Sequence, residues 1–284
     1  MTPTPPELPS TAEALLPLLA LSGFLVLTLV AFGARCAALG RPRTPYIESR
    51  ATPVLWKWLM EWWIWLWGPV ERACVALGIS PNAITIASTA LSGVASALLA
   101  SGRLSLGGWV YLFGASLDIV DGRVARAQGT STKAGAFLDS TLDRVAELLV
   151  FAALAVYFRH TAALYAALAA GGSSVLVSYA RARGEALGAN AEASVGGMQR
   201  AERVVLTGLP CALSPVCDAL VGAGASVVVV GSALGVLAAM TSWTALRRSY
   251  AIWRALRGPV VETPASTNVR WLDPMRRRQK RPGS

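Results

Sequence analysis

The sequence predicts an all-α integral membrane protein, and three observations lead to that prediction. Hydrophobic residues make up 54% of the 284 residues and charged residues only 15%. The mean hydropathy of +0.49 is too high for an ordinary soluble domain. Seven apolar segments each approach the roughly 20 residues that a helix needs to cross a bilayer, and short connections join the last six.

The first apolar segment, 14–32, predicts an N-terminal transmembrane helix. No Lys or Arg precedes it, whereas Arg35, Arg41, Arg43 and Arg50 follow it. This is the reverse of the charge pattern of a signal peptide. Because arginine collects on the cytoplasmic side, we expect the N-terminal end of this helix to face outward.

Residues 52–70 contain six of the ten tryptophans in the chain. Indole rings favour the headgroup region of a bilayer, where the ring is in an apolar environment and its N–H stays hydrated. The segment therefore predicts an amphipathic helix that lies along the cytoplasmic surface of the membrane. A short core helix is the alternative, because periodicity alone does not separate the two.

Six further apolar segments complete the predicted helices. Their approximate ranges are 83–101, 106–127, 136–157, 162–182, 204–221 and 223–246. Seven spans in all would begin outside and end inside, which agrees with the arginine-rich segments after the first and last of them.

These segments predict four regions: an N-terminal tail with an extra transmembrane helix at 1–50, an interfacial helix at 51–70, a six-helix catalytic domain at 71–248 and a basic cytoplasmic tail at 249–284. The net charge of +10 is concentrated in that tail. Since the tail directly follows an apolar segment, we expect it to lie beside anionic headgroups. A nucleic-acid-binding arm is the less favoured interpretation.

The cysteines and the single histidine exclude several kinds of site. Cys36, Cys74, Cys211 and Cys217 form no C-x-x-C pattern and lack the nearby histidine of a zinc site. His160 lies in a polar break between two apolar segments and has no partner for a catalytic triad. We expect buried cysteines and a histidine in a loop.

Four aspartates interrupt the otherwise apolar sequence. Asp118 and Asp121 are three residues apart and Asp139 and Asp143 are four apart, so each pair shares one face of a helix. Carboxylates at membrane depth are costly and usually mark a functional site. Because adjacent carboxylates repel one another, the two pairs predict a bound cation. Ligation by oxygen alone favours Mg²⁺, with Mn²⁺ able to replace it.

Residues beside the aspartates suit a phosphate ligand. Gly122 and Gly135 lack side chains and would let a ligand approach the backbone, although either could equally be a helix-packing glycine. Arg126 could neutralise a phosphate oxygen. The polar turn at 129–132 supplies hydroxyl groups between the two aspartate-bearing helices.

The pattern D-x2-D-G-x2-A-R-x8-G-x3-D-x3-D, which runs from Asp118 to Asp143, resembles the signature of the CDP-alcohol phosphotransferase family. The similarity covers about 81–246. The resemblance implies a six-helix membrane enzyme, to which the helix at 14–32 is an addition. It also implies transfer of a phosphatidyl group from CDP-diacylglycerol to an alcohol, with release of CMP, at the cytoplasmic face of the cell membrane. Family members are typically homodimers.

The resemblance also implies roles for individual residues. Asp118, Asp121 and Asp139 would hold the metal, and Asp143 would lie close to it and act as the base that accepts the proton of the acceptor hydroxyl. The residues implied to contact the CDP-lipid are Asn82, Thr85, Gly122, Arg126 and Thr132. Without the family match, 80–82 would read equally well as an ordinary helix start.

The acceptor alcohol is predicted from a group of arginines. The patterns S-Y-x-x-A-R-x-E-A-x-G at 178–188 and R-x-E-R at 200–203 are similar to the phosphatidylinositol phosphate synthase and archaetidylinositol phosphate synthase branch of the family. Guanidinium groups suit a phosphate, which favours a phosphorylated acceptor such as inositol phosphate. The candidate acceptor-binding residues are Arg181, Arg183, Arg200 and Arg203. Glycerol 3-phosphate, inositol and serine stay open, and the same arginines would also suit a cytoplasmic loop.

A cation transporter is the competing class, because intramembrane aspartates often relay ions. It does not account for Gly122, Ala125, Arg126 and Gly135 at these spacings. A structural scaffold is weaker still, since it gives the four aspartates no role.

Overall fold

The computed structural model describes residues 11–41, 54–193, 195 and 197–257. Its helices are α1 (Thr11–Leu39), α3 (Val54–Ala76), α4 (Pro81–Ala100), α5 (Leu104–Ala127), α6 (Lys133–Tyr157), α7 (Ala163–Ala186), α8 (Asn190–Ala193), α9 (Arg200–Ala212), α10 (Ser214–Val221) and α11 (Ala225–Ala255). The all-helical fold is confirmed. Outside 204–221 each predicted segment corresponds to one helix, although α1, α3 and α11 end six to nine residues later than predicted. The N-terminal tail at 1–10 and most of the basic tail, 258–284, lie outside the described residues.

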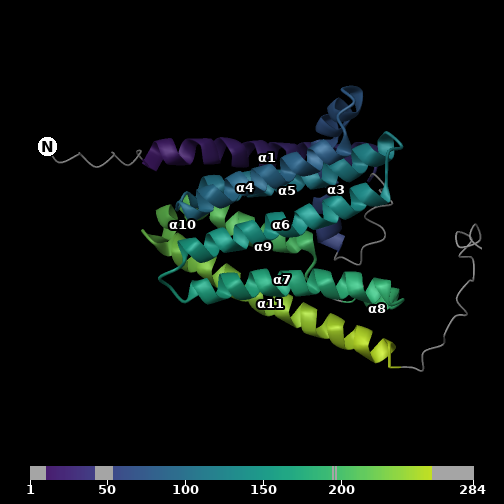
Figure 1. Ribbon diagram of the computed structural model, residues 1–284. Helices are drawn as coiled ribbons and strands as arrows, with labels where there is room; N and C mark the ends of the chain where they lie inside the picture. The colour runs from purple at the N-terminus through teal and green to yellow at the C-terminus, as the bar shows by residue number, and fades with distance from the viewer. Residues whose placement is uncertain (1–10, 42–53, 194, 196, 258–284) are drawn as a thin grey trace, which may run out of the picture.

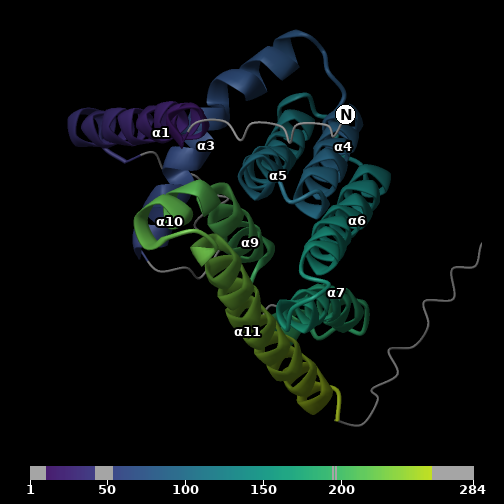
Figure 2. The same cartoon turned by 90° about the vertical axis from the view of Figure 1, so that its left-hand side faces the viewer.

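Six helices form a closed ring around a common core. α4 packs against α5 and α6, α5 packs against α9, and α11 closes the ring by packing against both α9 and α7, which in turn contacts α6. Figure 1 shows these helices running roughly side by side, and Figure 2 shows them arranged around the centre of the bundle. α6 and α9 therefore face each other across the ring.

Glycine permits a close approach between α5 and α9. A Cβ atom on Gly108 of α5 would lie 2.4 Å from the backbone nitrogen of Ala212 and 2.7 Å from the carbonyl oxygen of Gly208, both on α9. Helices in membranes pack through small residues because burying apolar side chains away from lipid provides little driving force. The α5–α9 contact depends on the absence of a side chain at Gly108.

Four helices are long and apolar enough to cross a membrane by themselves: α1, α4, α7 and α11. α9 and α10 together would form a fifth span. α5 and α6 do not meet the same measure of length and composition, and these are the two helices that carry the aspartates. Since both pack along α4, they lie beside a spanning helix and would reach the same depth.

The prediction of one continuous helix at 204–221 is wrong. The chain forms α9 and α10 there, and they meet at an angle of 51°. Proline explains the break, because Pro215 lies in the first turn of α10 and has no N–H to continue the hydrogen-bond ladder from α9. The short helix α8 was not predicted either.

The tryptophan-rich segment forms α3, which crosses the direction of the ring helices rather than running parallel to them (Figures 1 and 2). Trp62 is buried, and the indole nitrogen of Trp63 donates a hydrogen bond to Ser116 of α5 at 3.0 Å. Phe32 of α1 lies between Trp58 and Trp65, at 5.6 Å from each ring. The tryptophans thus join α1 and α3 to the ring, while their place at the membrane surface stays a prediction.

Candidate metal centre and active site

The four aspartates lie where α5 ends and α6 begins. Gly129, whose φ of +67° favours glycine, allows the tight turn between these helices. Thr132 then caps α6, since its hydroxyl accepts a hydrogen bond from the backbone N–H of Gly135 at 3.0 Å. The turn returns the chain antiparallel, so the last turns of α5 and the first turns of α6 lie at the same end of the ring, both packed against α4.

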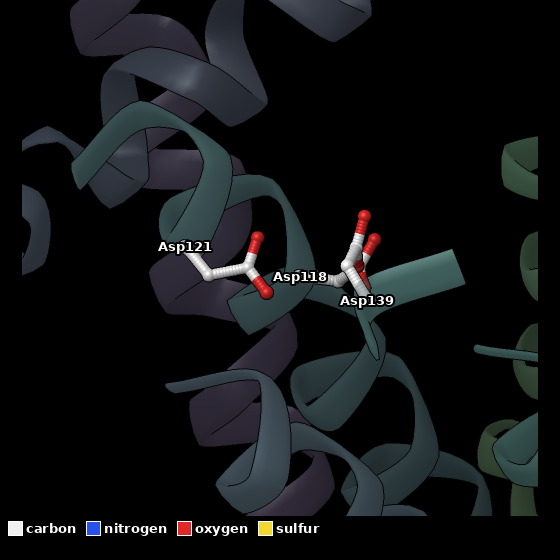
Figure 3. Close-up of side chains that lie close together, drawn as sticks. All are labelled: Asp118, Asp121 and Asp139. Atoms are coloured by element: carbon white, nitrogen blue, oxygen red, sulfur yellow. The ribbon is translucent and has the colours of Figure 1, made fainter. Parts of the chain in front are cut away.

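Three of the aspartates converge on one point (Figure 3). One carboxylate oxygen from each of Asp118, Asp121 and Asp139 lies within 4.8 Å of the other two. Asp121 is only 4% exposed, and Oδ1 of Asp139 is buried without a hydrogen-bond partner. Three carboxylates with an unsatisfied buried oxygen repel one another unless a cation lies between them. The arrangement fits a divalent metal, and the oxygen ligands suit a hard ion.

A hydroxyl group orients one of the three converging carboxylates. Thr85 of α4, itself 4% exposed, donates a hydrogen bond of 2.6 Å to Oδ2 of Asp121. Ser80 caps α4 by accepting a hydrogen bond from the N–H of Ala83, and Pro81 follows as the first helical residue. The family resemblance implied that Thr85 contacts the CDP-lipid, whereas in the structure its hydroxyl supports the carboxylate cluster.

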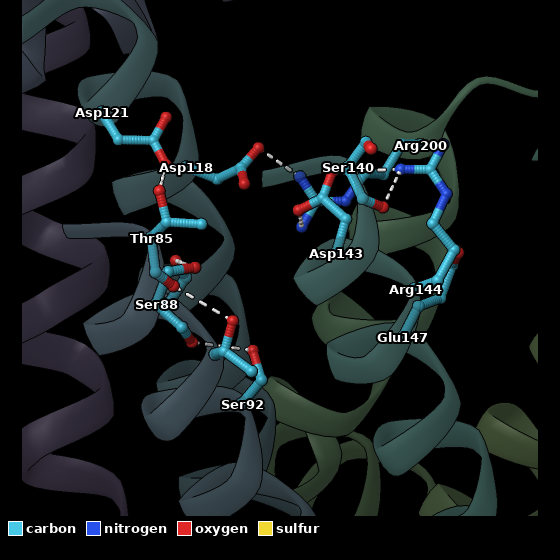
Figure 4. Close-up of polar contacts among 12 residues, drawn as sticks. Thr85, Ser88, Ser92, Asp118, Asp121, Ser140, Asp143, Arg144, Glu147 and Arg200 are labelled. Atoms are coloured by element: carbon cyan, nitrogen blue, oxygen red, sulfur yellow. Dashed lines mark hydrogen bonds and ion pairs between the residues drawn. The ribbon is translucent and has the colours of Figure 1, made fainter. Parts of the chain in front are cut away.

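Asp143 lies one helical turn after Asp139 and is not part of the three-carboxylate group. Its Oδ1 is 2.7 Å from Nη2 of Arg200, and its Oδ2 is 3.7 Å from Nη1 of Arg144. Arg200, the first residue of α9, also forms an ion pair with Asp118. Figure 4 shows these polar contacts, through which Arg200 links Asp118 of the three-carboxylate group to Asp143.

The other predicted CDP-lipid residues surround the same end of α4, α5 and α6. A Cβ atom on Gly135 would lie 3.4 Å from Oδ1 of Asn82 and 3.2 Å from the hydroxyl of Thr132. A Cβ atom on Gly122 would lie 3.5 Å from Nη1 of Arg126. The structure thus brings Asn82, Thr132 and Gly135 together, and it places Arg126 beside Gly122.

The four candidate acceptor-binding arginines occupy different environments. Only Arg200 contacts the aspartates. Arg181 is exposed and pairs with Glu185 one turn later on α7 at 2.9 Å, and Arg183 is also exposed. Arg203 is 3% exposed and pairs with Glu147 of α6. The structure does not gather these four side chains at one point.

Two buried charged residues, Glu147 and Arg248, were not among the site residues predicted from the sequence. Glu147 follows Asp143 by four residues, so the four-residue spacing of acidic residues from Asp139 onward was the available signal. Arg248 of α11 is 5% exposed and donates hydrogen bonds of 2.8 Å to the carbonyl oxygens of Val195 and Val177. No sequence pattern marked Arg248, because its partners are backbone atoms distant in the chain.

A ring of membrane helices with a carboxylate metal site at one end defines the class of an integral membrane metal-dependent protein. A family model for CDP-alcohol phosphatidyltransferase matches residues 78–247. The chain belongs to the CDP-alcohol phosphatidyltransferase family.

Curated relatives support the same assignment. Phosphatidylinositol phosphate synthase of Mycobacteroides abscessus is 38% identical over 143 residues, which are 49% of this chain and 64% of the relative. Archaetidylinositol phosphate synthase of Methanothermobacter thermautotrophicus is 32% identical over 181 residues, which are 64% of this chain and 87% of the relative. The chain thus matches less than two thirds of the first relative's length and most of the second.

Solved structures show the same fold. Phosphatidylinositol phosphate synthase (PgsA1) of Mycobacterium tuberculosis, in complex with manganese and citrate, aligns with a TM-score of 0.57 and 27% identity. The alignment covers 65% of this chain and 88% of that one. A second structure of that synthase, with CDP-DAG bound, aligns with the same TM-score and covers 92% of its own chain.

Proposed function

We propose that the protein is a phosphatidyltransferase that moves a phosphatidyl group from CDP-diacylglycerol to an alcohol and releases CMP. The observation that carries the proposal is the convergence of Asp118, Asp121 and Asp139, with an unsatisfied oxygen on Asp139 and Asp143 directly beside them. A transporter or scaffold has no need of a base next to a metal-binding site. The family assignment and the CDP-DAG bound to the mycobacterial synthase support the same reaction.

In this proposal the metal is Mg²⁺, with Mn²⁺ as a substitute, held by Asp118, Asp121 and Asp139. When bound, the metal neutralises negative charge on the pyrophosphate. Asn82, Gly122, Arg126 and Thr132 would contact the nucleotide and its phosphates, because they border the cluster on α4, α5 and the start of α6.

Asp143 is proposed to accept the proton of the acceptor hydroxyl as that oxygen forms a bond to the lipid-side phosphorus. The bond between this phosphorus and the bridging oxygen breaks, and CMP leaves with the electron pair. Arg200 lies 2.7 Å from Asp143. A phosphate of the acceptor bound by Arg200 would therefore hold the acceptor hydroxyl near the base.

We propose inositol phosphate as the acceptor. Arg200 beside Asp143 provides a guanidinium group at the position where a phosphorylated acceptor would need one. The names of both curated relatives favour the same substrate. A screen of radiolabelled inositol 1-phosphate, inositol, glycerol 3-phosphate and serine tests this, with incorporation of inositol 1-phosphate into lipid expected.

The site is proposed to open to the cytoplasm at the cell membrane. α4, α6 and α9 begin at the end that carries the aspartates, and α5, α7 and α11 end there (Figure 1). That end holds most of the described arginines, whereas Arg103 and Arg159 lie in the connections at the opposite end. Positively charged residues collect on the cytoplasmic side of membrane proteins.

The proposal is tested by measuring CMP release from CDP-diacylglycerol by the purified protein in detergent, with Mg²⁺ and each acceptor. Release that requires both metal and acceptor is expected. If none of the acceptors supports CMP release under either metal, the proposed reaction is wrong.

A further inference from the structure

A buried ion pair connects α6 and α9 across the ring, one helical turn further from the site end than Asp143 and Arg200. Nε of Arg203 lies 2.5 Å from Oε1 of Glu147, and Nη2 of Arg203 lies 3.1 Å from Oε2. Nη1 of Arg203 donates a further hydrogen bond to the carbonyl oxygen of Met198 at 3.3 Å. The side chains of Arg203 and Glu147 are 3% and 6% exposed. A two-point contact between a guanidinium and a carboxylate sets both distance and orientation.

This pair repeats the contact made at the site. On α6, Glu147 follows Asp143 by four residues, and on α9, Arg203 follows Arg200 by three. Residues at these spacings lie on the same face of a helix. α6 and α9 both begin at the site end, so the two ion pairs, Asp143–Arg200 and Glu147–Arg203, lie one above the other between the same two helices.

α6 and α9 are not neighbours in the ring. α6 packs against α4 and α7, while α9 packs against α5 and α11, so they face each other across the ring. Long side chains bridge the space between them. The distance from Arg200 to Asp143 therefore depends on how α9 is held relative to α6.

The same contacts argue against direct binding of the acceptor by Arg203. Its side chain is 3% exposed, against 26% for Arg200, and three of its nitrogens donate hydrogen bonds to Glu147 and Met198. A phosphate would have to displace a buried carboxylate to reach it, leaving that carboxylate unpaired, which is costly. Arg200 is the member of the two that lies among the aspartates.

We propose that Glu147 and Arg203 are positioning residues, whose buried ion pair fixes α9 against α6 so that Arg200 lies beside Asp143 to receive a phosphorylated acceptor. The inference rests on the proposed function, because it assigns to Arg200 the binding of the acceptor phosphate. It gives Arg203 a different role from Arg200 although both belong to the R-x-E-R pattern.

A positioning role for Glu147 and Arg203 predicts a different result from direct binding of the acceptor phosphate by Arg203. If Arg203 held the acceptor phosphate, Arg203→Gln would impair acceptor binding and Glu147→Gln would leave it unchanged or improve it. If the two residues position α9, either substitution removes the same contact. Both should then raise the KM for inositol 1-phosphate by a similar factor, at least about 10-fold, because the displaced Arg200 would lose its charge-assisted hydrogen bond to the acceptor phosphate.

The experiment compares wild-type protein with Glu147→Gln, Arg203→Gln and the double variant Glu147→Met/Arg203→Met. A buried ion pair can often be replaced by apolar residues of similar volume without loss of stability, so the double methionine variant keeps the test open if the single variants fail to fold. Glu61→Gln is the matched control, since it breaks the Arg41–Glu61 pair of 3.0 Å outside the ring. For each, the KM for both substrates, kcat and the thermal midpoint of unfolding are measured.

We expect the double methionine variant to unfold near the wild-type temperature and to retain the wild-type KM for CDP-diacylglycerol, while its KM for inositol 1-phosphate rises at least 10-fold. The Glu61→Gln control should match wild type in both KM values. Wild-type kinetics in the folded double variant would reduce the pair to a structural role and overturn the inference. So would a loss confined to Arg203→Gln. Absence of CMP release in wild-type protein would instead reject the proposed function itself.

Discussion

The hydrogen bond from Thr85 to Asp121 provides the sharpest test of the metal site. The bond is 2.6 Å long, and both residues are 4% exposed, so water does not replace the donor when it is removed. Thr85→Val keeps the shape of the side chain and removes only the hydroxyl group. The carboxylate of Asp121 then loses the partner that holds it in place.

The magnitude follows from the type of bond. A hydrogen bond to a charged group contributes about 1.5–3 kcal/mol, which corresponds to roughly 10- to 150-fold in an equilibrium constant. Partners that orient a metal-binding carboxylate typically contribute about 10- to 100-fold in metal affinity. We therefore expect Thr85→Val to weaken Mn²⁺ binding by about 10- to 100-fold.

Mn²⁺ binding can be measured without turnover, by titrating the protein in detergent and recording free Mn²⁺ by electron paramagnetic resonance. Thr89→Val is the matched control. Thr89 lies one turn later on α4, and its hydroxyl donates to the carbonyl oxygen of Thr85 at 3.0 Å, away from Asp121. The same substitution there should leave the Mn²⁺ affinity unchanged.

Unchanged Mn²⁺ affinity would refute this reasoning. If Thr85→Val binds Mn²⁺ as tightly as wild type, the hydroxyl does not support the metal ligand. If, in addition, the KM for CDP-diacylglycerol rises in Thr85→Val, Thr85 contacts the nucleotide, as the family resemblance implies.

Three further predictions follow from the same structure. Asp143→Asn should lower the rate of CMP release by at least about 100-fold, because no base then accepts the proton of the acceptor hydroxyl. Binding of the CDP-lipid, measured by equilibrium titration, should be retained. Full turnover in this variant would show that Asp143 is not the base. Asp139→Asn should weaken Mn²⁺ binding. Chelation with EDTA should abolish CMP release by the wild-type protein, and added Mg²⁺ or Mn²⁺ should restore it. Turnover without metal would contradict the assignment of the three carboxylates as a metal site. Gly108→Ala should destabilise the fold by about 1–3 kcal/mol in thermal unfolding, because its Cβ would lie 2.4 Å from the backbone of Ala212. Gly93→Ala, where nothing lies within 4 Å, should not destabilise it.

Local patterns in the chain predicted most of the helices. Apolar length marked the segments that became α4, α7 and α11, and the Ser80-Pro81 pair marked the start of α4. The same reasoning failed at 204–221, where hydropathy was continuous but Pro215 interrupts the backbone hydrogen bonds. Hydropathy averages over a window and does not register one missing N–H group.

The carboxylate cluster was predictable to a similar degree. Spacing within each helix placed Asp118 with Asp121 and Asp139 with Asp143, because helical geometry is local. The structure brings Asp139 to the first pair and leaves Asp143 next to Arg200. Which member of the second pair joins the cluster depends on how α6 is rotated against α5, and this is set by packing against α4 and α7.

The amino-acid sequence by itself determined an all-helical membrane protein with its acidic residues at one junction, since helix length, hydropathy and the i, i+3 and i, i+4 spacings are properties of short stretches of chain. Only the tertiary structure decided that Arg200 faces the aspartates while Arg203, three residues later, is buried against Glu147. The physical reason is that the environment of an arginine is set by the helix across from it. That neighbour is distant in the chain, and no local pattern specifies it.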